Sequence, residues 1–246
     1  MKSLTKIILT TLLLAGPVYI YARPHPVTIS DDFQKLEDRH LSGFNAVGLG
    51  GSFDVYITQG STESVKVEAP ENILSHIITE VDNGVLKIYN KNDSFHWGDL
   101  FGNHQKIAVY VVAKDLNAIS VSGSGDIFFK EGIRTNTLRL KVSGSGDMIG
   151  RVEVRSLETG ISGSGDVKIS GRADNSAVSV SGSGDFEGRG LITENTTVRV
   201  SGSGDASINA SGSISAAISG SGDVRYTGGA KNVMSSKSGS GDVERD

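Results

Sequence analysis

The pentapeptide Ser-Gly-Ser-Gly-Asp occurs seven times in the C-terminal half of the chain, and it constrains the fold more than any other feature. The copies begin at Ser122, Ser143, Ser162, Ser181, Ser201, Ser219 and Ser238. Each copy begins 18 to 21 residues after the start of the copy before it. A fixed period near 20 residues is typical of solenoids, in which each repeat forms one coil of a stack. The repeat region is therefore predicted to be a solenoid.

The residues on both sides of each pentapeptide indicate that the coils are built from strands. The position directly before it holds Val121, Val142, Ile161, Val180, Val200 and Ile218, and then Lys237. Apolar residues recur at every second position, with polar residues between them, as in 138–142. This alternation, rich in β-branched residues, is typical of a strand with one buried face. Each repeat is predicted to run strand, SGSGD turn, strand, and then a second turn around Gly132, Gly171 or Gly190.

Stacking of these coils buries apolar surface that one strand pair cannot bury alone. Equivalent residues of successive coils would then form ladders about 4.8 Å apart. No proline follows Pro70, so no strand of the repeat region lacks a backbone donor. The last copy has Ser235 and Lys237 where the others have mostly apolar residues, as expected of a polar terminal coil. We predict an all-β fold, with a right-handed parallel β-helix over residues 118–246.

Residues 41–117 carry the same alternation without the pentapeptide, as in 53–57 and 107–111. Asn83-Gly84 is a strong signal for a hairpin turn. A less regular N-terminal β region is therefore predicted. The pattern fits either a continuation of the same superhelix or a separately packed β-subdomain.

The first 22 residues resemble a secretory signal peptide. Lys2 and Lys6 precede an apolar run that is shorter than the roughly 20 residues of a membrane span, and Ala22 is a plausible cleavage point. We therefore expect an exported protein, periplasmic or on the cell surface, with no membrane span after cleavage. Residues 23–40 are expected to be a solvated leader with room for one helical turn within 31–40.

Composition excludes several classes of function. The chain has no cysteine, so it has no disulfide framework, thiol chemistry or cysteine-bound zinc. Its formal net charge of −4 argues against a general nucleic-acid-binding surface. No cofactor or metal site is predicted.

The recurring glycine and aspartate have a structural explanation. Glycine accepts a positive φ at a sharp corner, and an aspartate side chain accepts hydrogen bonds from nearby backbone amides, as in an Asx-turn. If the coils are in register, the aspartates also form a column of carboxylates, and Ca²⁺ could relieve their repulsion. We predict no specific calcium site, because one carboxylate per coil is few for an ion that takes six to eight oxygen ligands. The column would comprise Asp126, Asp147, Asp166, Asp185, Asp205, Asp223 and Asp242.

Residues 90–104 break the β pattern and concentrate aromatic side chains, including the only tryptophan. Phe95, Trp97 and Phe101 are the candidate ligand contacts, because exposed aromatic residues on a loop can stack on sugars or bind a partner. The alternative, which we favour, is that they cover an apolar edge of the β-helix. His96 and His104 are too loosely spaced for a metal pair.

No catalytic residues are predicted. Acidic residues outside the pentapeptide fall at different phases of the repeat and make no convincing acid–base pair. They include Glu131, Glu153, Glu158, Glu187 and Glu194. All five histidines precede the repeats, and no nucleophile-elbow motif is present.

Three segments together with the pentapeptides resemble the head GIN domain family, described as putative auto-transporter adhesins. They are LSGFNAVGLGGSFDVYITQG at 41–60, VDNGVLKIYN at 81–90 and NAISVSGSGDI at 117–127. The resemblance implies an exported bacterial protein with a bent β-helix related to pectin-lyase-like folds, and it supplies no enzymatic residues. A non-enzymatic adhesin-like or scaffold protein of the cell envelope is therefore expected, with a cell-surface polysaccharide or an envelope protein as partner. The alternatives are a glycan-binding protein that uses residues 90–104 and a carbohydrate-active enzyme.

Overall fold

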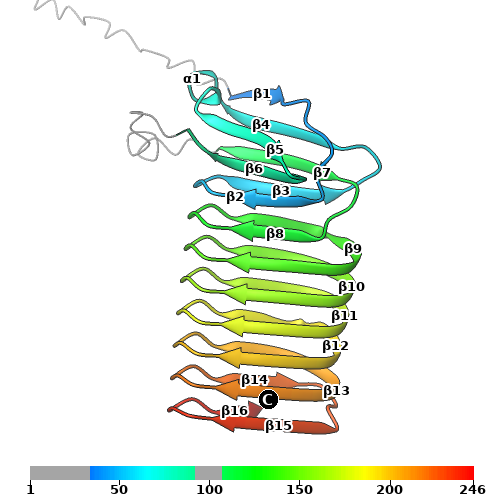
Figure 1. The fold of residues 1–246 in the computed structure, drawn as a ribbon, viewed down its shortest axis with the longest axis vertical. Helices are drawn as coiled ribbons and strands as arrows, with labels where there is room; N and C mark the ends of the chain where they lie inside the picture. Colours follow the sequence, from blue (N-terminus) through cyan, green and yellow to red (C-terminus); the bar gives the residue numbers. More distant parts are fainter. Residues whose placement is uncertain (1–33, 92–106) are drawn as a thin grey trace, which may run out of the picture. The chain divides into compact units, whose positions relative to one another are not determined.

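The computed structural model describes residues 34–91 and 107–246, which are folded almost entirely as strands. The strands belong to one hydrogen-bonded sheet that winds into a β-solenoid of about seven turns (Figure 1). The predicted all-β solenoid is thus confirmed. Within the described ranges, no helix is long and apolar enough to cross a membrane.

In the repeat region each full coil is one long, bent strand. The strands run from the residue after one pentapeptide to the residue before the next: β9 (Ile127–Val142), β10 (Met148–Ile161), β11 (Val167–Val180), β12 (Phe186–Val200) and β13 (Ala206–Ile218). Neighbouring coils pair in parallel, as the stacked ribbons of Figure 1 show. The second turn expected around Gly132 and Gly171 does not interrupt the strands. At both glycines φ is positive, and nearby shifts of register let the ladder continue around the bend as a β-bulge.

The apolar columns on both sides of the pentapeptide line the core, as predicted. In the column before it, no residue from Val121 to Ile218 is more than 3% exposed. The column after it is equally buried and comprises Ile127, Met148, Val167, Phe186, Ala206 and Val224. Burial of one such aliphatic or aromatic side chain stabilises a fold by about 1.5–3 kcal/mol. The hydrophobic core is therefore a set of ladders that run through the whole stack.

The glycines of the pentapeptide are required by the close approach of neighbouring backbones. Positive φ, the reason expected from the sequence, is wrong for all of them except Gly239. A Cβ on Gly163 would lie 2.0 Å from the carbonyl oxygen of Gly144, and one on Gly165 would lie 2.1 Å from that of Gly146. The same Gly144 carbonyl accepts hydrogen bonds from the N–H groups of Ser164 and Gly165, at 3.0 and 3.2 Å. Each corner thus rests directly on the backbone of the corner before it.

The N-terminal β region continues the same solenoid, which decides between the two alternatives left open by the sequence. It contains β1 (Gln34–Asp38), β2 (Ala46–Leu49), β3 (Asp54–Gln59), β4 (Ser64–Pro70), α1 (Glu71–Leu74), β5 (Ile77–Asp82), β6 (Val85–Asn90), β7 (Ala108–Ala113) and β8 (Ala118–Val121). Strand β3 pairs in parallel with both β7 and β9, and β2 pairs in parallel with both β6 and β8. The coil made by β2 and β3 therefore lies inside the stack, between strands that follow it in the sequence.

An eighth, altered copy of the corner joins β2 to β3. The carbonyl oxygen of Gly51 accepts hydrogen bonds from Ser124 and Gly125, as the first glycine of each pentapeptide does for the next coil. Phe53 stands where the second glycine would be, and its side chain is fully buried. Residues 50–54 read GGSFD, so the match to SGSGD was too weak to find by sequence repetition.

Antiparallel strands complete the N-terminal end. Strand β1 pairs with β4, β4 pairs with β7, and β5 pairs with β6 through the turn at Asn83-Gly84. Residues 34–38, expected to be part of the leader, form β1, so the helical turn expected within 31–40 is wrong for this segment. Pairing with β4 gives these residues a ladder of backbone hydrogen bonds that a leader in water would lack.

The C-terminal coil is mostly polar over 235–246, as predicted, although it also exposes Val233 and Met234. It is formed by β14 (Val224–Thr227), β15 (Asn232–Lys237) and β16 (Val243–Arg245), and every residue of β15 is exposed. Lys237 forms an ion pair with Asp242, the last aspartate of the column. A lysine in place of the usual Val or Ile thus pairs with the carboxylate that has no further coil to bind.

The corner contact predicts that Gly163→Ala destabilises the protein, whereas Gly160→Ala does not. The Gly163 methyl group would overlap the Gly144 carbonyl, at a cost of about 1–3 kcal/mol. Gly160 lies three residues away on β10 and has nothing within 4 Å of an added Cβ. Urea denaturation of both variants measures the difference, and equal unfolding midpoints would refute the contact as the reason for glycine.

Candidate functional site

The aspartates of the pentapeptide form a ladder of hydrogen bonds between coils. One carboxylate oxygen of Asp147 accepts the backbone N–H of Asp166 at 2.8 Å, and the Asp166 carboxylate accepts that of Asp185 at the same distance. The pattern continues from Asp126 to Asp242. The expected acceptance of backbone amides is therefore confirmed, but the amide belongs to the next coil and not to a local Asx-turn.

Basic side chains neutralise part of this column. Arg225 contacts the second carboxylate oxygens of Asp205 and Asp223, at 3.1 and 2.8 Å. Among the described residues, no group of three or more His, Asp or Glu side chains is placed to hold a metal ion. The ladder as described is thus a structural device, and the prediction that it binds no specific calcium stays a prediction.

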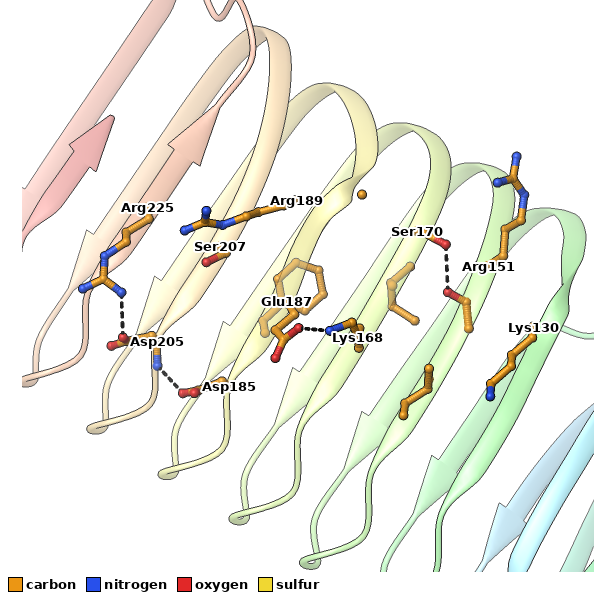
Figure 2. Close-up of a pocket in the computed structure, with 15 residues that line it drawn as sticks. Lys130, Arg151, Lys168, Ser170, Asp185, Glu187, Arg189, Asp205, Ser207 and Arg225 are labelled. Carbon is orange, nitrogen blue, oxygen red and sulfur yellow. Dashed lines mark hydrogen bonds and ion pairs between the residues drawn. The ribbon is translucent and has the colours of Figure 1, made fainter. Parts of the chain in front are cut away.

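A groove of about 780 Å³ lies on the outer face of the coils, along the half of each strand that follows the pentapeptide. Strands β9 to β14 all contribute residues to it. Figure 2 shows the labelled polar side chains carried by successive coils. We call this hollow the basic groove, because its charged residues are Lys130, Arg151, Lys168, Arg189 and Arg225 with Asp185, Glu187 and Asp205.

The three carboxylates of the basic groove are already bound. Glu187 pairs with Lys168, and Asp205 binds Arg225 through one oxygen and the N–H of Asp223 through the other. Asp185 accepts the N–H of Asp205 at 2.7 Å. In Figure 2, dashed lines mark the Glu187–Lys168 and Asp205–Arg225 ion pairs and the Asp185–Asp205 hydrogen bond, together with the hydrogen bond that Ser170 donates to the Gly150 carbonyl. The groove therefore carries five cations against three anions.

Two of the groove cations have no close carboxylate partner. Lys130 lies over the ring of Phe128, with its nitrogen 5.2 Å from the ring centroid, and forms no ion pair within the described part of the chain. Arg151 is 3.7 Å from Glu153, whose other oxygen is 2.8 Å from Arg134. The positive charge of Lys130 and Arg151 is thus the least neutralised in the groove.

A stack of three aromatic rings continues from the groove toward the N-terminal coils. Tyr110, Tyr56 and Phe128 come from β7, β3 and β9, and their ring centroids are 5.5 and 5.2 Å apart. Phe128 pairs in register with Ile149, which lines the basic groove. Burial, followed by the carboxylate of Asp54, raises the pKa of the Tyr56 hydroxyl above its ordinary value. The outer face therefore joins an aromatic stack to a cationic groove.

A second hollow of about 580 Å³ lies at the bend of the coils and shares Arg151 with the basic groove. Its lining includes four arginines but only two carboxylates, those of Glu153 and Asp174. Arg155 and Arg172 form no ion pair among the residues that the structure describes. The excess of positive charge thus extends around the bend, although the whole chain has a net charge of −4.

Of the residues singled out in the sequence, Asp185, Asp205 and Glu187 line the basic groove and Glu153 lines the second hollow. Phe95, Trp97 and Phe101, with His96 and His104, lie outside the described residues. Glu153, Glu158 and Glu187 each pair with a basic residue of a neighbouring coil. The basic groove was not predicted, because its residues come from six strands. The signal available in the sequence was the recurrence of basic residues just after the pentapeptides.

The chain belongs to the family described as "Putative auto-transporter adhesin, head GIN domain", which it matches over residues 43–230. The resemblance noted in the sequence is thereby confirmed. A comparison with curated protein sequences gives no match.

Solved structures of similar fold include two described as putative adhesins. One, from Bacteroides fragilis, is 26% identical with a TM-score of 0.81, and the match covers 87% of this chain and 97% of that chain. Another, from Parabacteroides distasonis, is 25% identical with a TM-score of 0.72, and the match covers 88% of this chain and 98% of that chain. A third, from Parabacteroides distasonis, is described as a putative lipid binding protein. It is 22% identical with a TM-score of 0.68, and the match covers 88% of this chain and 98% of that chain. The third likeness shows the fold alone.

The aspartate ladder predicts different effects for two substitutions of Asp166. Asp166→Ala removes the acceptor for the Asp185 N–H and should cost about 1–2 kcal/mol of unfolding free energy. Asp166→Asn keeps an acceptor oxygen and should remain within about 0.5 kcal/mol of the parent protein. Chemical denaturation compares the two, and an alanine variant as stable as the asparagine variant would contradict a stabilising ladder.

Proposed function

We propose that this chain is an exported, non-enzymatic protein of the bacterial cell envelope, with an adhesin-like or scaffold role. The observation that carries the proposal is the basic groove, a cationic surface held on rigid, stacked coils. A solenoid offers an extended face on which many weak contacts can add up, which suits adhesion to large partners. Membership of the head GIN domain family supports the adhesin-like role.

Export is supported by the N-terminal sequence. Lys2 and Lys6, the apolar run that follows and Ala22 have the order of a secretory signal peptide. Cleavage after Ala22 would release a chain that acts in the periplasm or on the cell surface.

A binding role is favoured over catalysis by the way the groove carboxylates are used. A glycosidase or lyase needs carboxylates that are free to transfer protons or to attack the substrate. Asp185 and Asp205 instead accept backbone N–H groups of the next coil, and Glu187 pairs with Lys168. These carboxylates hold neighbouring coils together.

The alternative of glycan binding through residues 90–104 remains a separate proposal. It predicts that Trp97→Ala abolishes binding to a glycan or surface while the unfolding midpoint stays unchanged. Retention of binding in this variant would leave the groove as the binding surface.

The envelope role predicts that the cleaved form, residues 23–246, sediments with the envelope fraction of the producing cell. The bound amount should saturate with protein concentration, because a specific surface offers a limited number of sites. Protein centrifuged without envelope is the control. Failure to sediment with envelope under any salt condition would refute the proposed function.

The non-enzymatic role predicts no turnover of polysaccharides. Incubation of the cleaved form with a panel of uronate-containing and neutral glycans should release no new reducing or unsaturated ends. Detection of either product above a boiled-protein control would show that the protein is an enzyme.

A further inference from the structure

The basic groove carries its positive charge as a row along the stack of coils. Lys130, Arg151, Lys168, Arg189 and Arg225 come one each from β9, β10, β11, β12 and β14. The row is staggered over two adjacent columns, because Lys168 pairs in register with Ile149 and Glu187, whereas Arg151 pairs with Ser170. Neighbouring coils are about 4.8 Å apart. A single anion can contact only one or two of them. A linear polyanion parallel to the axis of the stack can contact the whole row.

The pairing of these cations leaves charge available to a ligand. Lys168, Arg189 and Arg225 have carboxylate partners, but all three ion pairs lie at the surface, where such pairs exchange readily with other anions. Lys130 has no carboxylate partner within the described part of the chain, and Arg151 has only the distant Glu153. The free end of the row is therefore at β9 and β10.

Apolar surface lies beside that free end. Ile149 lines the groove, and its neighbour in register is Phe128, the last ring of the aromatic stack. Sugar rings combine apolar C–H faces with polar edges, so an acidic sugar can pack on Ile149 and Phe128 while its charged group meets Lys130 or Arg151. A simple phosphate or a salt ion would not use this apolar surface.

From these observations we propose that the basic groove binds a linear acidic polysaccharide, which lies along the stack from β9 to β14. The proposal rests on the envelope-binding function and names the class of ligand for it. Carboxylate or sulfate groups of the glycan pair with the row of cations, and sugar rings pack against the apolar surface at β9 and β10. A lipid headgroup is the competing ligand, and the test separates the two.

The test compares dextran sulfate with neutral dextran, which share one backbone and differ in charge, and adds polygalacturonate as a second acidic polymer that carries carboxylates. The cleaved protein should bind immobilised dextran sulfate and polygalacturonate, but not neutral dextran. Its affinity should fall as the salt concentration rises, because salt screens contacts between exposed charges. Absence of binding to both acidic polymers would overturn the proposal.

Two double variants locate the site. Lys130→Ser/Arg151→Ser removes the least neutralised cations of the groove and should weaken binding to the acidic polymers by roughly tenfold or more, equivalent to about 1.4 kcal/mol. Lys141→Ser/Arg199→Ser makes the same change of charge at two exposed residues on the strand halves that precede the pentapeptide, outside the groove lining. This control should bind like the parent protein. Equal weakening of both variants would show that binding depends only on net charge and would overturn the proposal.

Two further measurements separate the possible failures. The first is binding to phosphatidylglycerol vesicles. If the parent protein binds the vesicles but not the acidic glycans, and Lys130→Ser/Arg151→Ser loses vesicle binding, the groove binds lipid headgroups and the proposal is overturned. The second is sedimentation with the envelope fraction. If Lys130→Ser/Arg151→Ser sediments as much as the parent protein, the acidic-glycan site is refuted while the envelope function stands. Loss of that sedimentation in the groove variant alone supports the proposal.

Discussion

The structure depends on the contact between one Ser-Gly-Ser-Gly-Asp corner and the next. At each corner the backbone of one coil rests on the carbonyl oxygens of the coil before it, and the gap leaves no room for a Cβ atom. The Gly144 carbonyl, for example, accepts two N–H groups from the following corner. The aspartate that ends each pentapeptide adds a hydrogen bond from its carboxylate to the next aspartate's N–H. Together these contacts fix the register of successive coils.

A fixed register has consequences on both faces of the strands. Inside, equivalent residues such as Val142 and Ile161 stack into continuous apolar ladders. Outside, equivalent positions just after the corner form a row, in which an aromatic stack at the N-terminal end gives way to a groove with more cations than anions. The groove carboxylates mainly join coils, so the surface is better suited to holding a charged partner than to chemistry.

Much of the fold could be predicted from the repeated pentapeptide and the alternation around it, because each coil uses the same residues for the same contacts. The prediction failed where one copy departs from the repeat or where pairing is distant in sequence. GGSFD at 50–54 forms an altered corner, and residues 34–38 pair with β4 instead of forming a leader. The reason proposed for the motif glycines was also wrong, because backbone contact between coils cannot be seen in one isolated turn.

A β-solenoid with glycine corners, a buried apolar column on each side of them and a polar chain end could be read from the amino-acid sequence alone. Those features repeat along the chain, and local patterns of period two encode them. The folded arrangement was needed to show that β2 and β3 lie between later strands, and that Lys130, Arg151 and Arg225 share one groove. The reason is physical: stacking brings together residues that lie tens of positions apart, and the charge at any one of them says nothing about the row that they form.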